Sequence, residues 1–376
     1  MMITTLHEAN QETRVAITPN AIKNYLKSQL TVGIESGAGH AAGYTDEQFT
    51  QAGAAILEKN ELLAKTNILL CVNEPDPDHL TGLPAHSMII GHVDDHPESK
   101  LIQWCQQNQI TLLSMNLIPR ISRAQSMDSL SSQANLAGYR AVLEASNLFP
   151  RAIPMMMTAA GMIQPAKVLI LGAGVAGLQA IATAKRLGAV VYAFDVRRAA
   201  KEQVESLGAE FVEVALDEDS ETQGGYAAET SEEYKQQQSA LIDQYAKMAD
   251  IVITTALIPG RKAPILITKA TVEGMKPGSV IVDLATSRGG NCEVSVKDKV
   301  SKHGEVTIVG WSNLAGLVPA TASDLYANNL VHLLQLLTNK GPELELNPDD
   351  EIIKQAVLCH EGKYRPFQEI KETQHA

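Results

Sequence analysis

The sequence lacks the features that mark disulfide-rich, metal-binding, nucleic-acid-binding or secreted proteins. Its four cysteines, Cys71, Cys105, Cys292 and Cys359, lie far apart and form no C-x-x-C pair, so we expect reduced structural thiols and no metal site. The net charge is −12 and no basic run offsets it, which argues against nucleic-acid binding because phosphate contacts need clustered cations. The chain does not open on a basic region followed by an apolar stretch, so we expect no secretory signal and a cytoplasmic protein.

One uncharged stretch has nearly the length of a membrane span. Residues 168–184 carry no charged side chain, and a span needs roughly 17–25 residues. The stretch contains three glycines and Gln179, which favours a buried strand followed by a helix. These residues lead us to expect no membrane span, and the length of 376 residues predicts two or three folded domains.

Short, mostly β-branched runs alternate with helical segments, and this pattern predicts parallel α/β sheets. In the first part, a predicted strand at residues 14–18 leads into a helix that begins at Pro19, where proline is tolerated in the first turn. The strands predicted after it are 31–35, 68–72, 88–91 and 111–114. The strands predicted from Lys167 onward are 168–171, 190–194, 211–214, 251–254, 279–284 and 306–309.

Two longer helices are expected between these two series and after the second one. Residues 131–147 have a helical composition, and leucines at helical spacing follow Pro319. We interpret both helices as connections between two domains. The predicted domains are residues 1–133 completed by 317–376, and residues 134–316.

A glycine motif stands directly after the first strand of the second series. Gly172, Gly174 and Gly177 form G-x-G-x-x-G between the strand at 168–171 and a helix. Gly172 permits the tight turn, Gly174 lets a pyrophosphate approach the backbone, and Gly177 lets helix and strand pack closely. The free N–H groups of the helix N-terminus attract phosphate. We therefore predict two Rossmann-like, doubly wound parallel-sheet domains joined by long helices, the second of which binds a dinucleotide; a purely structural turn is the alternative.

Asp195 ends the following strand, about 20 residues beyond the glycines, where a carboxylate binds the adenosine ribose hydroxyls. It would repel a 2′-phosphate, which favours NAD(H) over NADP(H). Arg197 and Arg198 follow at once and could pair with such a phosphate, and Asp195 could also be a helix cap or a surface acid.

The segment 217–238 is long, polar and rich in Glu and Gln, with Gly224, Gly225 and Tyr226 near its middle. Loops longer than roughly 12–15 residues are usually lids, binding loops or disordered stretches. The segment is either a hinged flap that carries Tyr226 onto a ligand or a solvated acidic insertion.

The run from Arg120 to Arg140 closely resembles the NAD(H)-binding component, the alpha-subunit domain, of proton-translocating NAD(P) transhydrogenases. Residues 154–161, 172–188, 254–260 and 289–292 carry the same resemblance. It covers most of the chain, and the broader superfamily includes alanine dehydrogenases.

By this resemblance, Arg120, Gln125, Asp128 and Ser131 form a loop that orients the nicotinamide, with Gln125 and Ser131 holding its carboxamide. Arg120 and Asp128 shape the junction with the partner domain, unless they merely pair with each other. The implied nucleotide-binding residues are Arg120, Ile121, Ser122, Gln125, Ser126, Met127, Asp128, Gly172, Ala173, Gly174, Val175, Gly177, Asp195, Val196, Arg197, Gly225, Tyr226, Thr255 and Leu257. The family's mobile Gly-Gly-Tyr loop favours the flap interpretation of Gly224–Tyr226.

Chemistry separates transhydrogenation from amino-acid oxidation. Hydride transfer between two nicotinamides needs alignment at about 3–3.5 Å and no acid or base, whereas oxidation of an amino acid needs proton transfer. Alanine dehydrogenases place a lysine before Glu-Pro, where this chain has Asn73 before Glu74. His92 matches their histidine, but a lone histidine is more often structural.

Departures from the transhydrogenase pattern at His7–Glu8 and at residues 311–317 leave a non-catalytic NAD-binding regulator open. An alanine-dehydrogenase-like enzyme is the other alternative.

The resemblance implies an NAD(P)+ transhydrogenase, an oxidoreductase and translocase of the Re/Si-specific, proton-translocating class. NADH bound here passes hydride to NADP+ on a partner subunit, and a separate membrane-spanning subunit forms the proton channel. The chain is then expected to be a homodimer on the cytoplasmic face of the inner membrane, as a peripheral component.

Overall fold

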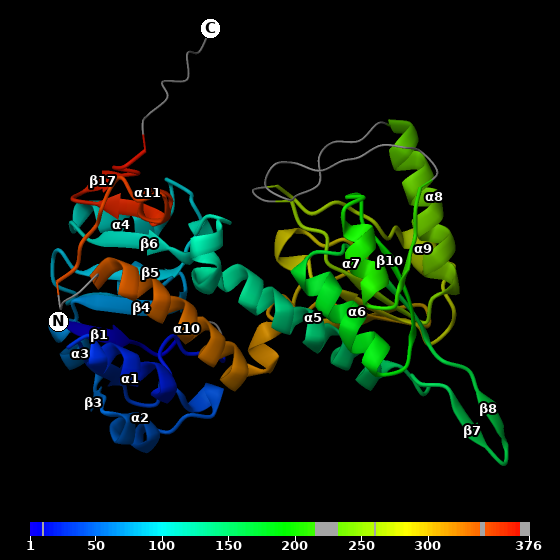
Figure 1. Ribbon diagram of the computed structural model, residues 1–376, viewed down its shortest axis with the longest axis horizontal. Helices are drawn as coiled ribbons and strands as arrows, with labels where there is room; N and C mark the ends of the chain where they lie inside the picture. The colour runs from blue at the N-terminus through cyan, green and yellow to red at the C-terminus, as the bar shows by residue number, and fades with distance from the viewer. Residues whose placement is uncertain (10, 215–231, 259–260, 339–342, 369–376) are drawn as a thin grey trace, which may run out of the picture. The chain divides into compact units, whose positions relative to one another are not determined.

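Two mainly parallel sheets organise the chain, one in each of two units (Figure 1). The computed structural model describes residues 1–9, 11–214, 232–258, 261–338 and 343–368. The first unit comprises residues 1–133 and 318–376, and the second comprises residues 134–317. The chain passes from one unit to the other within helix α5 (Ser129–Leu148) and directly before helix α10 (Pro319–Thr338).

The sheet of the first unit has the order β17-β16-β6-β5-β4-β1-β2-β3. Its strands are β1 (Met2–Thr5), β2 (Thr31–Glu35), β3 (Ala55–Leu57), β4 (Ile68–Asn73), β5 (Met88–His92), β6 (Thr111–Ser114), β16 (Val357–His360) and β17 (Lys363–Tyr364). The strands from β6 to β3 are parallel, and β16 and β17 add antiparallel pairing at one edge. The strand order reverses between β1 and β4, so the carboxyl ends of these two strands flank the crevice where such sheets bind ligands.

Helices cover both faces of this sheet and bury the alternating apolar residues of its strands. One face packs against α1 (Pro19–Lys27), α10 and α11 (Glu351–Ala356), and the other against α3 (Lys59–Lys65) and α4 (Lys100–Gln107). Helix α2 (Asp46–Ala52) begins with a capping box in which Thr45 and Gln48 bond each other's backbone N–H groups.

The segment from Arg14 to Thr18, expected to open a strand–helix unit, is not a strand. The backbone N–H of Val15 donates to Ser323 Oγ at 3.0 Å in helix α10 and not to a neighbouring strand. The strand between β4 and β2 is β1, which the sequence pattern did not reveal. Helix α1 does begin at Pro19.

The sheet of the second unit has the order β11-β10-β9-β12-β13-β15-β14. Its strands are β9 (Lys167–Leu171), β10 (Val190–Phe194), β11 (Glu210–Phe211), β12 (Ile251–Thr254), β13 (Val280–Asp283), β14 (Val300–His303) and β15 (Val306–Val309). Six are parallel and β14 is antiparallel. The prediction of a strand at 211–214 was wrong in extent, because only Glu210 and Phe211 pair, and β14 was missed. The order reverses between β9 and β12, as in dinucleotide-binding sheets.

Helices α5, α6 (Val175–Arg186) and α7 (Ala200–Ser206) pack on one face of this sheet, and α8 (Glu232–Met248) and α9 (Lys269–Glu273) on the other. Residues 168–184 divide between β9 and α6, which confirms the predicted strand and helix. Within the described part of the chain, no helix combines the length and the apolar character needed to cross a bilayer.

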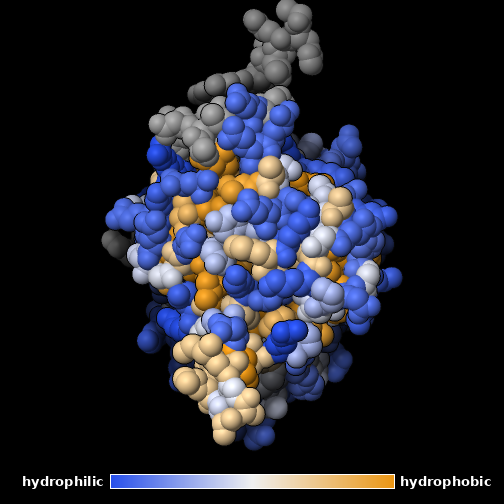
Figure 2. All heavy atoms as spheres, turned by 90° about the vertical axis from the view of Figure 1, so that its right-hand side faces the viewer, coloured by the Kyte–Doolittle hydropathy of each residue, from blue (hydrophilic) through white to orange (hydrophobic). Residues whose placement is uncertain are grey.

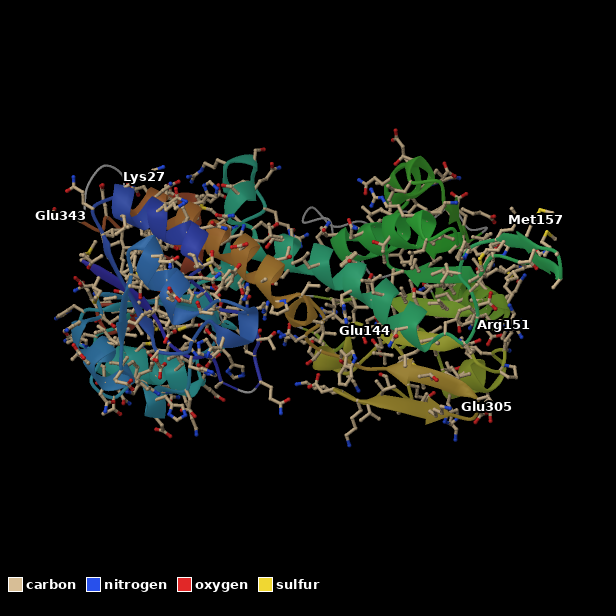
Figure 3. All side chains as sticks on the ribbon, turned by 90° about the horizontal axis from the view of Figure 1, so that it is seen from below. Lys27, Glu144, Arg151, Met157, Glu305 and Glu343 are labelled. Atoms are coloured by element: carbon tan, nitrogen blue, oxygen red, sulfur yellow. The ribbon has the colours of Figure 1, made fainter. Side chains whose placement is uncertain are left out.

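A hairpin of β7 (Met156–Thr158) and β8 (Gly161–Ile163) projects from the second unit (Figure 1). All six of these residues are exposed. Figure 2 shows the hairpin as a hydrophobic patch at the lower end of the face it views, and Met157, labelled in Figure 3, is 81% exposed.

All four cysteines are buried and unpaired. Burial raises the pKa of each of these thiols. Both findings agree with reduced structural thiols.

Candidate functional site

The glycine loop occupies the carboxyl end of β9 and the start of α6. Gly172 has φ +100°, a conformation that favours glycine. A Cβ on Gly177 would lie 1.8 Å from the carbonyl oxygen of Gly172, so only glycine lets α6 pack this close to the strand. A Cβ on Gly174 would meet no atom within 4 Å. The two outer glycines therefore shape the turn, and the middle one faces open space.

This open space lies at the N-terminus of a 12-residue helix, α6. Gly174 is its N-cap and provides no side-chain cap to the first N–H groups, which have no partner within the helix. Val175, the first helical residue, is 40% exposed. Free N–H groups, the positive end of the helix dipole and room above them fit a pyrophosphate.

Asp195 follows β10 and ties that strand to the glycine loop. Its Oδ2 accepts from the backbone N–H of Ala173 at 2.7 Å, and its Oδ1 from the N–H of Arg197 at 2.8 Å. The Arg197 guanidinium adds bonds of 2.9 Å to each oxygen. The Asp195 side chain is 7% exposed. Asp195 therefore stands beside the glycine loop with its carboxylate held in place, and the nearest arginine is directed at that carboxylate.

A second group of bonds fixes the loop after β12. Thr255 Oγ1 donates to the carbonyl of Gly172 at 3.0 Å, and the N–H of Thr255 donates to Leu171 O at 2.8 Å. Leu257 is 46% exposed. The Asn291 side chain bonds both backbone groups of Ala256. Sequence reasoning did not single out Asn291 as a site residue, because its partners lie far away in the sequence.

In the first unit, the predicted nicotinamide loop forms the 3-10 helix η4 (Ser122–Met127) and the start of α5. Asp128 accepts from the backbone N–H of Ser131 at 2.9 Å and from its hydroxyl at 2.6 Å. Gln125 and Arg120 are exposed, as are Ser122 and Ser126, whereas Met127 is 7% exposed and Ile121 is partly buried. The loop thus holds Ser131 through Asp128 and presents Gln125 to solvent.

A buried polar cluster lies at the carboxyl ends of β1 and β4. Glu12 binds the Arg14 guanidinium through two bonds of 2.8 Å and accepts from Asn73 Nδ2 at 2.8 Å. Burial alone would raise the pKa of Glu12, but the bonds and charge of Arg14 outweigh it and lower the pKa to about 2. Arg14 also donates to Gln133 Oε1 at 2.9 Å.

The pKa values of two titratable groups near this cluster are shifted in opposite directions. Burial raises the pKa of Glu8 to about 7, against the bonds from the N–H groups of Val72 and Asn73. Burial and the charge of Arg14 lower the pKa of His92 to about 3, and its Nε2 is 2.8 Å from Ser129 Oγ. His92 is therefore neutral at physiological pH.

The predicted flap at Gly224, Gly225 and Tyr226 lies outside the described residues.

Both halves of the chain match models of one family. Residues 5–137 match the family described as alanine dehydrogenase/PNT, N-terminal domain, and residues 141–366 match alanine dehydrogenase/PNT, C-terminal domain.

Similar proteins carry transhydrogenase and alanine dehydrogenase names. The NAD(P) transhydrogenase subunit alpha of Cereibacter sphaeroides is 45% identical over 356 residues, covering 93% of this chain and 68% of that protein. A crystal structure of transhydrogenase from Sinorhizobium meliloti superposes with a TM-score of 0.88 at 44% identity, covering 97% of this chain and 100% of that one. An L-alanine dehydrogenase structure gives a TM-score of 0.80 at 25% identity, covering 97% and 96%.

Proposed function

The chain belongs to the alanine dehydrogenase/PNT family, and from that premise we propose that it is the NAD(H)-binding subunit of a proton-translocating NAD(P) transhydrogenase. Asp195 beside the glycine loop carries the proposal. A carboxylate at this place binds the hydroxyls of an unphosphorylated ribose and repels a 2′-phosphate. In the structure the Arg197 guanidinium bonds both Asp195 oxygens, so the ribose hydroxyls replace these bonds when the nucleotide binds. The similarity to transhydrogenase alpha subunits over nearly the whole chain supports the same conclusion.

The bound nicotinamide supplies the hydride, and this chain's residues bind and orient the nucleotide. Gly172, Gly174 and Gly177 receive the pyrophosphate at the start of α6, and Asp195 receives the adenosine ribose. Gln125 and Ser131 hold the carboxamide. No residue has to move a proton at the reacting carbon, so the contribution of the chain is alignment with the partner's nicotinamide.

The buried polar cluster of Glu12, Arg14 and Asn73 in the first unit argues against amino-acid oxidation, the function of the other branch of the family. That reaction needs a group that transfers a proton near neutral pH. His92, with a pKa of about 3, is a poor candidate, and Asn73 cannot transfer a proton. Glu8 has a pKa of about 7, but its two carboxylate oxygens already accept from the backbone N–H groups of Val72 and Asn73. Arg14, which could bind a substrate carboxylate, is already bonded by Glu12. These contacts leave transhydrogenation as the better supported function.

We infer that two further subunits complete the enzyme. One binds NADP(H) and accepts the hydride, and a separate membrane-spanning subunit carries the protons. The relatives' names support a multi-subunit enzyme, since they denote a subunit alpha. In this assembly the chain lies on the cytoplasmic face of the inner membrane, and the reaction belongs to the Re/Si-specific class.

We also propose that the chain is a homodimer, supported by the β7–β8 hairpin. Met155, Met157 and Met162 are 58%, 81% and 55% exposed, and residues 152–166 carry no charge. A two-stranded hairpin is only marginally stable by itself in water, and an exposed apolar patch marks an interaction site. An uncharged patch can meet its own copy across a two-fold axis without repulsion.

The proposal is tested by mixing the purified chain with a purified NADP(H)-binding subunit of a transhydrogenase. NADH and an NAD+ analogue, cycled through NADP(H) on the partner, should react only when both proteins are present. L-alanine with NAD+ and this chain alone should give no NADH. Turnover of alanine, or no transfer in the mixture although both proteins bind their nucleotides, would contradict the proposal.

A further inference from the structure

A buried carboxylate organises the loop that follows β13. Asp283, at the end of this strand, is fully buried. Its oxygens accept from the backbone N–H groups of Ala285 at 2.9 Å, Asn291 at 2.9 Å and Cys292 at 3.0 Å, and from Ser295 Oγ at 2.6 Å. Because each bond ends on a backbone group or a short side chain, Asp283 fixes the position of Asn291.

Asn291 is fully buried, and both the oxygen and the nitrogen of its side chain are hydrogen-bonded. Its Oδ1 accepts from the N–H of Ala256 at 3.0 Å, and its Nδ2 donates to the carbonyls of Ala256 at 2.9 Å and Pro264 at 2.8 Å. One amide thus holds both backbone groups of Ala256, as a neighbouring strand would. With these three bonds made, Asn291 acts on any ligand through Ala256 and not by contact.

Ala256 lies where the second half of a dinucleotide has to pass. The adenosine half belongs on the β10 side, at Asp195, and the pyrophosphate at the start of α6, after β9. A nucleotide that crosses the point where the strand order reverses continues over β12. Thr255, the residue after β12, bonds the Gly172 carbonyl through its hydroxyl at 3.0 Å, so this segment is also tied to the glycine loop.

We propose that Asn291 is a positioning residue for the nicotinamide half of the bound nucleotide. It holds Ala256 just beyond the carboxyl end of β12, beneath the nicotinamide riboside. This inference rests on the proposed NAD(H) binding. It predicts that loss of the Asn291 amide weakens the binding of the nicotinamide half and spares the adenosine half.

The test compares NADH with ADP, which has the adenosine and both phosphates but lacks the nicotinamide riboside. Each is titrated into the full chain by isothermal titration calorimetry. Asn291→Ala should weaken NADH binding at least 10-fold and ADP binding less than 2-fold. Asn291→Ser, which is small and uncharged and keeps a polar group, should act in the same direction, and it replaces the alanine variant if that one does not fold.

Asp250→Asn is the matched control for a merely structural effect. Asp250 directly precedes β12, at the amino end of the strand, and accepts from the Lys167 N–H at 2.7 Å and from Lys276 Nζ at 2.8 Å. This variant should lower the melting temperature and leave both dissociation constants within 2-fold.

Three outcomes are decisive. Equal weakening of NADH and ADP by the Asn291 variants, or no weakening of either, would overturn the positioning role. A wild-type chain that binds neither nucleotide would instead refute the proposed function.

Discussion

Replacement of Gly174 by alanine separates the binding of nucleotide from the stability of the fold. The φ of Gly174 is −75°, which any L-residue adopts, and the added Cβ meets no protein atom within 4 Å. The lower chain entropy of alanine stabilises the fold by about 0.4–1 kcal/mol, and alanine is a poorer N-cap than glycine by a comparable amount. We therefore expect the free energy of unfolding without ligand to change by less than about 0.5 kcal/mol.

The same methyl group occupies the space assigned to the pyrophosphate. Loss of charge-assisted bonds to the first N–H groups of α6 costs about 1.5–3 kcal/mol, which weakens NADH binding roughly 10- to 100-fold. The assay combines thermal unfolding with and without NADH and a fluorescence titration of NADH. Unchanged NADH affinity in a folded Gly174→Ala protein would refute the placement of the phosphates.

Gly177→Ala is the contrasting variant. Its Cβ would lie 1.8 Å from the Gly172 carbonyl oxygen, so backbone has to move. Its melting temperature should fall by several degrees even without NADH, whereas that of Gly174→Ala should not.

Three further predictions concern other parts of the chain. Folding raises the pKa of the half-buried Glu8 from 4.5 to about 7, so the free energy of unfolding should be highest below pH 4.5 and fall by about 1–3 kcal/mol, after discount for the exposure of Glu8, as the pH rises to 7. Urea unfolding of Glu8→Gln should show a smaller fall over this pH range. An unchanged pH dependence in that variant would contradict the assignment. Gln125→Asn should slow hydride transfer to the partner about 100-fold with NADH affinity within about 3-fold, and equal losses in both would refute an aligning role. Replacement of both Met157 and Met162 by Glu should convert a dimer to a monomer in light scattering while NADH binding is retained, and a persistent dimer would exclude the hairpin as its interface.

The strands that could be predicted are mostly those buried on both faces, which read as continuous apolar runs. Strands β2 and β6 have the predicted bounds, and β12 does as well. The errors arose where pairing depends on distant partners. Val15 and its neighbours have the composition of a strand, but its N–H bonds Ser323, 308 residues away.

The hairpin escaped prediction for a different reason. Methionine is not among the strand-forming residues, and the six exposed residues of β7 and β8 show no alternation of apolar and polar side chains. Such a segment is recognisable only once its pairing is seen.

In the candidate site, too, residues at a regular spacing along the chain could be predicted, and contacts between distant segments could not. The glycines and Asp195 could be found because their spacing along the chain is set by one strand, one helix and the next strand. The hydrogen bonds by which Asp283 holds Asn291 and Asn291 holds Ala256 could not be predicted, because they join backbone groups of loops that follow different strands. Similarly, the bonds between Arg197 and Asp195 became apparent only in the structure.

The preference for NADH over NADPH tests the central claim most directly. Dissociation constants of both nucleotides, measured by calorimetry on the purified chain, should differ by at least about 10-fold in favour of NADH. The ribose hydroxyls of NADH can donate to the Asp195 carboxylate in place of Arg197, whereas a 2′-phosphate has no hydroxyl to donate there and is repelled by the carboxylate. NADPH binding equal to or tighter than that of NADH would contradict the account.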